Sequence, residues 1–459
     1  MNLHDAPGRP NPDQYLHGRG AAWFAFSMTL GLMVVDYVDR QVIVSLFPYM
    51  KRDWGLSDKQ LGALVSVVSI TVALGALPVA LFADRASRVK SIVAMAAVWS
   101  VATISCMFTR GYGQLLAARA MVGLGEAGYG SVGAALIASH FPARLRGALL
   151  AGFFASASIG SVLGVMLGGL IAARWGWQAA FGVVGVPGLL LALLYLKVRD
   201  YRTVALTPRL ERATQSATAT MRAIAQRLLQ SRTMLWVCIG GAAQLVVVSA
   251  VWSWLPSWLN RVHGIEPARA AVMAAGVVLC GAVGSVLWGA VVDRAGARRP
   301  RAKLQLLATL CLVSLVVLVA AFGLPKLGVL LTAGQQYALI AVGGLLMTCS
   351  VGPVSAIVID VVHPGVRATG ASVLALFQNL FGLAAGPFIA GLLSDRFDLN
   401  TALAVMPAFS VLAAGAFWRG TATYEGDLRR CADATAETAA ALDACAAAPA
   451  SPLPQRAAA

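Results

Sequence analysis

Three charged side chains lie inside the first long apolar stretch of the chain, residues 21–46. They are Asp36, Asp39 and Arg40, and their spacings of three and four residues place them on one face of a helix. A charge at bilayer depth costs about 2.5–3.5 kcal/mol on insertion scales. Because lipid cannot offset that cost, we expect this face to meet protein or a water-filled cavity. A structural ion pair that only joins helices is the alternative interpretation.

Two more charges, Arg119 and Glu126, lie seven residues apart in the apolar stretch 113–138. With a rise of about 1.5 Å per residue they are about 10 Å apart along a helix axis, too far for a direct pair. The five charges then comprise three acids and two arginines, so one acid is free to carry a proton or to pair with a cation. We predict a proton-coupling site made of Glu126 as main carrier, Asp36 as its rival, Asp39 and Arg40 as the switch, and Arg119 as charge partner.

The composition is that of a membrane protein, because 58% of the residues are hydrophobic and only 12% are charged, whereas soluble domains have about 25% charged residues. Runs of about 20 apolar residues are long enough to span a bilayer, and the chain has twelve. We therefore predict an all-α polytopic membrane protein with twelve transmembrane helices in two six-helix halves. The expected spans are 21–46, 59–82, 90–109, 113–138, 146–172, 177–198, 234–260, 268–291, 303–323, 335–361, 368–393 and 400–419.

Most of the 36 Lys and Arg residues fall between these spans, on the side of the N-terminus. By the positive-inside rule we expect both termini in the cytoplasm and the protein in the cell inner (plasma) membrane. The net charge of +16 is explained by this topology, so no nucleic-acid partner is predicted. The predicted parts are an N-terminal tail (1–20), a first half (21–198), a basic linker (199–232), a second half (233–420) and a disordered C-terminal tail (421–459). The linker's arginines could instead bind anionic lipid headgroups.

Two short turns with an Asp-Arg pair repeat between the second and third spans of each half, at residues 80–90 and 289–299. A second repeat places residues 140–147 against 363–370, each before a glycine-rich helix. A carboxylate at such a turn can pair with arginine or cap a neighbouring helix. The candidate residues for a cytoplasmic latch are Asp84, Arg85, Arg88, Asp293, Arg294, Arg298, Arg299, Arg146 and Arg367.

The second turn resembles the G-x-L-x-D-R-x-G-R-R signature of the major facilitator superfamily, while the first departs from it at Ala80 and Ser87. The segment from Arg119 to Gly125 resembles the superfamily's fourth-helix motif R-x-x-x-G-x-G, and the glycines of 160–169 resemble its fifth-helix glycine motif. The resemblance covers about residues 20–420. It implies that the repeated turns latch the cytoplasmic side in the outward-facing state.

Within that superfamily, the stretch from Asp36 to Arg40 together with Glu126 looks like the Spinster-like transporters. That resemblance implies roles in proton coupling and gating for Asp39, Arg40 and Glu126, and an amphipathic lipid substrate such as a lysophospholipid or sphingoid compound. Asp36 stands where we would expect asparagine, which adds an acid. The organic-anion symporter branch has a similar first helix and remains the alternative.

The second half has no buried charges to match the first, so we expect it to shape the substrate pocket. Asp360 lies near a cytoplasmic end and is expected to pair with an arginine such as Arg367. Aromatic and neutral polar candidates suit an amphipathic lipid-like or small organic substrate with one polar head; an organic-anion/proton symporter or a drug-efflux antiporter is the alternative. The predicted substrate-binding residues are Tyr37, Tyr129, Phe154, Gln244, Trp252, Phe377 and Asn379.

Enzyme and pump signatures are absent from the sequence. It contains no G-x-x-x-x-G-K-[ST] phosphate loop, no G-x-S-x-G and no H-E-x-x-H, and its five histidines are scattered. No C-x-x-C pair occurs among the seven cysteines, so neither a metal site nor a disulfide framework is predicted. We expect a monomer that is not an enzyme, has no cofactor apart from a proton gradient, and has its substrate and membrane lipids as partners.

Overall fold

The computed structural model describes residues 15–85, 87–200, 231–329, 331–362 and 367–447. These ranges contain helices and no strands, and twelve of their helical segments are long and apolar enough to cross a membrane. The predicted fold class is therefore confirmed. The predicted basic linker lies almost wholly in residues 201–230, outside the described part of the chain.

The first half contains six spans, of which the first and fourth are built from consecutive helical pieces. Helix α1 packs along α7, and α5 packs against both α3 and α4. In order, the elements are α1 (Arg19–Val42), η1 (Ile43–Leu46), α2 (Phe47–Trp54), α3 (Asp58–Arg85), α4 (Arg88–Cys106), α5 (Tyr112–Glu126), α6 (Tyr129–His140), α7 (Ala143–Trp175) and α8 (Trp177–Tyr195).

The second half repeats this plan, with interruptions in its fourth, fifth and sixth spans. Helix α11 lies at its centre, and 83% of its most apolar window is buried. The elements are α11 (Arg232–His263), α12 (Pro267–Arg298), α13 (Arg301–Gly323), η3 (Leu324–Leu327), α14 (Ala333–Met347), α15 (Val351–Val361), α16 (Arg367–Phe377), the π-helical η5 (Gln378–Leu383), α17 (Ala385–Arg396), α18 (Leu399–Val405), η6 (Met406–Ala408) and α19 (Phe409–Ala447).

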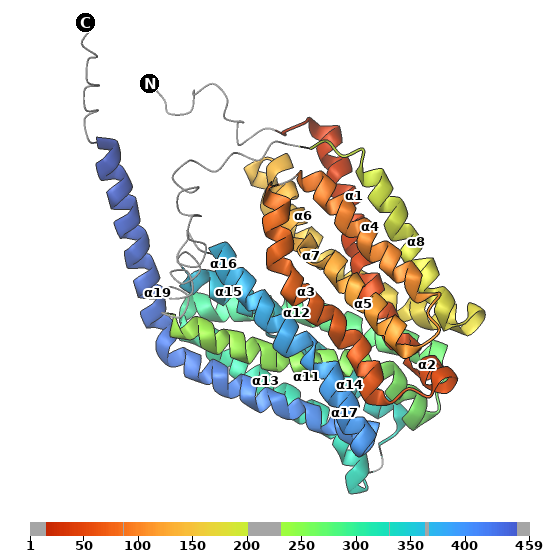
Figure 1. Cartoon of the computed structure of the whole chain (residues 1–459). Helices are drawn as coiled ribbons and strands as arrows, with labels where there is room; N and C mark the ends of the chain where they lie inside the picture. The colour runs from red at the N-terminus through yellow and green to blue at the C-terminus, as the bar shows by residue number, and fades with distance from the viewer. Residues whose placement is uncertain (1–14, 86, 201–230, 330, 363–366, 448–459) are drawn as a thin grey trace, which may run out of the picture.

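The ribbons of the two halves diverge toward the ends of the helices that lie near the chain termini and meet at the other end (Figure 1). We call these the terminal end and the opposite end of the bundle. Across the junction α3 packs along α17, and α7 packs along α12. The approach of α3 to α17 requires glycine, because a Cβ at Gly62 would lie 2.3 Å from the carbonyl oxygen of Pro387. The opposite end is thus closed by direct packing of one half on the other.

The fourth span of each half is broken after a helix of 15 residues. In the first half α5 ends at Glu126, and Gly128 then adopts a φ of +84°, which favours glycine. In the second half α14 ends at Met347, and α15 begins at Val351. We call these two interruptions the first and second breaks, and the apolar pattern of the sequence continues through both of them.

The predicted disordered tail is wrong for residues 421–447, which continue helix α19. Two of the side chains that attach this extension to the bundle are buried. The buried Tyr424 donates its hydroxyl hydrogen to Asp360, and the buried carboxylate of Asp427 accepts from the hydroxyl of Ser231 and the N–H of Thr233. The alanine content of the segment also favours a helix. Residues 448–459 are outside the described chain.

Candidate functional site

The guanidinium of Arg40 lies between two buried carboxylates, one from its own helix and one from the first break. Its Nε atom is 2.9 Å from Oε2 of Glu126 and 3.6 Å from Oδ2 of Asp36. The short contact with Glu126 is an ion pair whose atoms are not aligned as a hydrogen bond. The guanidinium also lies 5.3 Å from the ring centre of Tyr37. The single positive charge of Arg40 therefore neutralises only one of the two negative charges next to it.

The third acid, Asp39, has an arginine of its own. Nη1 of Arg119 is 3.2 Å from Oδ1 of Asp39 and 3.4 Å from its main-chain oxygen. The hydroxyl of Thr103 on α4 contacts the other carboxylate oxygen. Asp39 and Arg119 are almost fully buried, 1% and 0% exposed. This pair balances its own charge, so the excess negative charge expected from the sequence falls on Asp36 and Glu126.

Close helix contacts bring these residues together, and the glycines of the two sequence motifs permit them. A Cβ at Gly123 would lie 2.1 Å from Oγ1 of Thr71 on α3. A Cβ at Gly160 would lie 2.4 Å from the carbonyl oxygen of Val34 on α1. Such small residues let backbones approach within a bilayer. The motifs that pointed to the family thus pack α5 closely on α3 and α7 closely on α1.

The predicted pocket residues of the first half have three different settings. Tyr129 is buried, donates its hydroxyl hydrogen to the carbonyl of Thr29 at 2.5 Å, and packs against Trp99. In this structure its side chain is part of the core of the first half. Tyr37 is half-buried beside Arg40, and Phe154 is 53% exposed.

The predicted pocket residues of the second half form two groups. Gln244 is buried and donates from Nε2 to the carbonyl of Met347, while Trp252 lies half-buried further along α11. Both face the second break. Phe377 and Asn379 lie at the start of the π-helical segment, where the Asn379 amide donates to the carbonyl of Ala375. Segments of this kind often mark functional sites.

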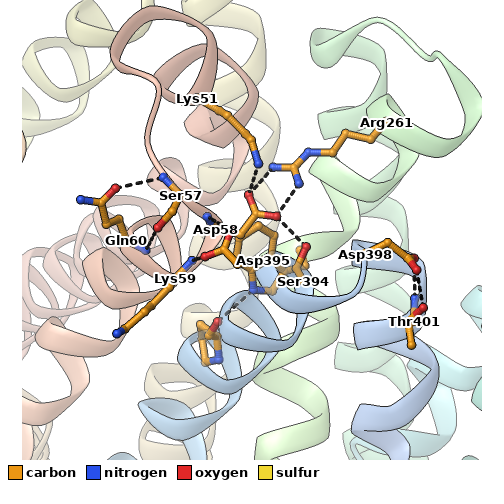
Figure 2. A network of polar contacts seen from close by, with 12 residues as sticks. Lys51, Ser57, Asp58, Lys59, Gln60, Arg261, Ser394, Asp395, Asp398 and Thr401 are labelled. Carbon is orange, nitrogen blue, oxygen red and sulfur yellow. Dashed lines mark hydrogen bonds and ion pairs between the residues drawn. The ribbon is translucent and has the colours of Figure 1, made fainter.

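A polar network closes the opposite end, and the sequence analysis missed it (Figure 2). Its centre is the carboxylate of Asp58, which is only 2% exposed. It accepts from Lys51 at 2.7 Å, from both terminal nitrogens of Arg261 at 2.6 and 2.8 Å, and from Ser394 at 2.5 Å. Asp58 and Lys51 belong to the first half, whereas the other two belong to the second. We call this set the opposite-end lock.

A second carboxylate strengthens the lock by capping α3 from the other half. The two oxygens of Asp395 accept from the N–H groups of Asp58 and Lys59, each at 2.8 Å. Free N–H groups at a helix start carry partial positive charge, so a carboxylate there is favourable. The contacts join residues more than 330 positions apart in the chain. No local signal in the sequence could have found this partnership, although a charge beside each span was visible.

At the terminal end, the predicted latch residues whose contacts the structure describes lie apart from one another in their interactions. Asp293 lies 3.8 Å from Lys303 in its own half, and Lys303 also contacts Asp360 at 3.0 Å. Asp360 thus has a lysine partner, and the side chain of the expected Arg367 lies outside the described residues. Arg146 donates to the carbonyl of Phe141. Of the others, Arg294, Arg298 and Arg299 are exposed, Arg88 is half-buried, and the side chains of Asp84, Arg85 and Arg367 lie outside the described residues.

Two six-helix halves with charges buried in the first half are typical of membrane transporters. A family model described as Major Facilitator Superfamily matches residues 29–385, so the chain belongs to this family. A solved bacterial homolog of the human lysosomal transporter Spinster, crystallised inward-facing and unoccupied, superposes with a TM-score of 0.78 at 22% identity. The superposition covers 89% of this chain and 99% of that one.

Three curated relatives place the chain within the family. An MFS-type efflux pump of Mycolicibacterium smegmatis is 28% identical over 90% of this chain and 95% of its own length. Protein spinster homolog 1 of Homo sapiens is 27% identical, covering 90% and 83%. The sphingosine-1-phosphate transporter SPNS2 of Mus musculus is 25% identical, covering 85% and 75%. The expected resemblance to the Spinster-like branch is confirmed, and the chain is an integral multi-pass transporter rather than an enzyme.

Proposed function

We propose that this protein is a proton-coupled secondary transporter for an amphipathic, lipid-like substrate. The observation that carries the proposal is the sharing of Arg40 by Asp36 and Glu126. Two ionised acids around one guanidinium leave a negative charge at low dielectric, and one bound proton removes it. The site therefore has two states that differ by a proton, as coupling to a proton gradient requires.

In this proposal Glu126 is the main proton carrier. It is the last residue of α5, directly before the first break, so a change in its attraction to Arg40 acts where the helix path is interrupted. When Glu126 is ionised, Arg40 holds α5 to α1. When Glu126 is protonated, Asp36 is the only one of these two acids that is still ionised. The attraction between Arg40 on α1 and Glu126 on α5 then weakens. The separate Asp39–Arg119 pair keeps the remaining charges balanced in both states.

Alternating access uses the two ends of the bundle in turn. With the positive-inside rule placing the terminal end in the cytoplasm of a plasma membrane, the lock at Asp58 closes the external side, which corresponds to an inward-facing state. Opening to the outside then requires Arg261 and Ser394 to leave Asp58. The repeated Asp-Arg turns would latch the cytoplasmic side in that second state.

The lipid-like substrate is proposed from the chemistry of the two halves and from the names of relatives. Acids and arginines are concentrated in the first half, whereas the described core of the second half has aromatic and neutral polar residues around α11. One relative is named as a sphingosine-1-phosphate transporter. A molecule with one polar head and an apolar chain suits such a division. A drug-efflux antiporter is the second candidate, because another relative is named as an efflux pump.

Reconstitution into proteoliposomes tests both parts of the proposal. A labelled lysophospholipid and a lipophilic cation drug would be offered in separate experiments, with and without an imposed pH gradient. We expect lysolipid movement that follows the gradient and is lost when a protonophore collapses it. Gradient-driven movement of the drug alone would favour the antiporter. Movement that is indifferent to pH would contradict proton coupling.

A further inference from the structure

The second break collects three buried polar atoms that have no hydrogen-bond partner among the described residues. They are Oε1 of Gln244, Nε1 of Trp252 and Oγ of Ser350. Gln244 and Ser350 are 0% and 1% exposed, and Trp252 is half-buried. Buried polar groups in native proteins almost always have a partner, which is a protein group, water or a ligand. Three such groups around one interruption therefore indicate a site at which water or a ligand supplies the missing hydrogen bonds.

The contacts at the second break place these groups around the same few residues. The Gln244 amide nitrogen donates to Met347, the last residue of α14, at 3.1 Å, and Ser350 follows three residues later. A Cβ at Gly281 would lie 2.9 Å from Cζ2 of Trp252 and 3.1 Å from Cγ2 of Thr348, so the indole ring borders the break from the other side. The atoms come from α11 and from the α14–α15 junction.

The break is also held in shape by bonds that do not use these three atoms. The hydroxyl of Thr348 donates to the carbonyl of Gly281 at 2.8 Å, and the Gln244 nitrogen is fixed on Met347. Because that nitrogen is the bonded end of the amide, its oxygen is the end left free. The three free atoms are therefore directed by their neighbours, which is the arrangement of a preorganised binding site.

The hydrogen-bonding character of the atoms indicates what they bind. The indole N–H can only donate, the amide oxygen can only accept, and the serine hydroxyl can do both. A group that donates and accepts at once, such as a hydroxyl, satisfies this set. The side chains of Gln244, Trp252 and Ser350 are uncharged, so the set itself offers an ionised group no counter-charge.

We propose that the second break is a subsite for a hydroxyl group in the polar head of the substrate. The subsite rests on the proposed function, because it assigns the head of the amphiphile to the second half. The first break, at the matching place in the first half, has Glu126 with Arg40 and Asp36. In this arrangement the first break binds the proton, and the second break recognises the neutral polar part of the substrate.

A matched pair of lipids tests the subsite with the full-length protein. Lysophosphatidylglycerol and lysophosphatidylethanol have the same phosphate charge and the same backbone hydroxyl, and they differ in that only the glycerol head group adds hydroxyls beyond the phosphate. Their affinities would be measured by competition against a fluorescent lysolipid in detergent. We expect wild-type protein to favour the glycerol head by about tenfold, because a site built for a hydroxyl is left with unpaired groups by the other lipid.

Ser350→Ala, Trp252→Phe and Gln244→Leu should each reduce this preference to about threefold or less, mainly by weakening the glycerol lipid. Ser257→Ala is the matched control. Like Ser350, Ser257 has a buried hydroxyl without a described partner, but it lies on α11 and has no described bond to the break. It should keep the wild-type preference. Melting temperatures of all variants would be compared to check that each one folds. If Trp252→Phe or Gln244→Leu fails to fold, the lipid preference of Ser350→Ala, the smallest change, decides the test.

The outcomes separate the subsite from the function on which it rests. If wild type binds both lipids equally, or if Ser350→Ala retains the full preference, the subsite is wrong while the lipid transporter stands. If wild type binds neither lipid, the lipid-like substrate is wrong, and the subsite for its head is overturned with it. A preference lost in the break variants and kept in Ser257→Ala supports the proposal.

Discussion

The two halves share a plan, yet the breaks in their fourth spans contain different kinds of side chain, charged in the first half and neutral in the second. Each is broken after 15 residues, and each break packs against the first span of its own half. At the first break Glu126 meets a guanidinium and a second acid. At the second break the groups are an amide, an indole and a hydroxyl. A repeated fold thus supplies two equivalent positions, and the side chains decide that one responds to protons and the other to neutral polar groups.

This difference also has an energetic side. A buried ion network is sensitive to the loss of either partner, since the remaining charge stays in low dielectric. A buried neutral group that loses its partner costs about 1–3 kcal/mol, which is less. Variants in the first half should therefore have larger effects than equivalent variants in the second. Four experiments test this comparison and its extension to the two ends of the bundle.

Glu126→Gln should have the largest effect, because it fixes the proposed carrier in a neutral form. Substrate should still bind and exchange across the membrane. A gradient of one pH unit can drive about a tenfold concentration ratio when one proton moves per substrate, and we expect that ratio to fall to about one. The measurement is lysolipid distribution in proteoliposomes under an imposed pH gradient.

Asp36→Asn is the matched comparison for this experiment, since Asp36 shares Arg40 but lies at 3.6 Å instead of 2.9 Å. We expect it to retain part of the driven accumulation. If Asp36→Asn abolishes accumulation and Glu126→Gln does not, the roles of the two acids are reversed. Accumulation in both variants would place the carrier elsewhere.

Arg119→Leu should have the next largest effect, on folding rather than on coupling. It would leave Asp39 buried with only Thr103 at its carboxylate, and breaking a buried pair costs about 3–5 kcal/mol. Melting in detergent would show this loss. The double variant with Asp39→Asn should recover part of it, and Gln244→Leu in the second half should cost less. Equal losses in both halves would contradict the energetic difference between them.

Much of this architecture could be predicted from the sequence, because apolar run length and basic-residue bias are local quantities. The charges of α1 and α5 stood out for the same reason, since Asp36 or Glu126 in an apolar run is visible without a structure. Which acid pairs with which arginine could not be predicted. The pairing of Asp39 with Arg119 depends on how α1, α4 and α5 pack.

Residues outside the spans were harder to interpret. Asp58 and Asp395 looked like ordinary charges beside membrane helices, yet they meet across the two halves. Tyr129 was assigned to the pocket because of its type, but its ring is buried against Trp99. The extension of α19 was missed because an alanine-rich polar segment is equally typical of a solvent-exposed tail. Its order depends on Tyr424 and Asp427, whose partners are remote in the chain.

The opposite-end lock extends the comparison from the halves to the two ends. Asp58→Asn replaces a carboxylate that binds two cations, including the bidentate Arg261, by a neutral amide. Charge-assisted bonds of this kind contribute about 1.5–3 kcal/mol, so we expect the outward-open population to rise about tenfold. Distances between spin labels at the opposite end would measure it.

Asp398→Asn is the control, because Asp398 is at the same end but pairs with Lys326 inside the second half. Partial burial opposes ionisation, but bonds from Lys326 and Thr401 lower the pKa of Asp398 to about 2. Its stabilising contribution is thus present above pH 4 and lost only as the pH falls toward 2. The control should leave the populations unchanged between pH 5 and 8. A shift as large as that of Asp58→Asn would show that the lock is not specific.

The smallest effect is expected at the terminal end, for Asp293→Asn. In the inward-facing state Asp293 is 62% exposed and 3.8 Å from Lys303. Removing such an exposed ion pair costs only about 0–1 kcal/mol of stability in this state. If the repeated turn latches the bundle only when this end closes, the variant weakens the outward-facing state alone. The population should then move about two- to fivefold toward the inward-facing form, as cysteine labelling from each side would measure.

Asp360→Asn is the control, because it removes the other partner of Lys303 and a bond to Tyr424. It should loosen α19 without this shift. Unchanged labelling in Asp293→Asn would remove the latch and leave Asp58 as the acid on which the balance between the two ends depends.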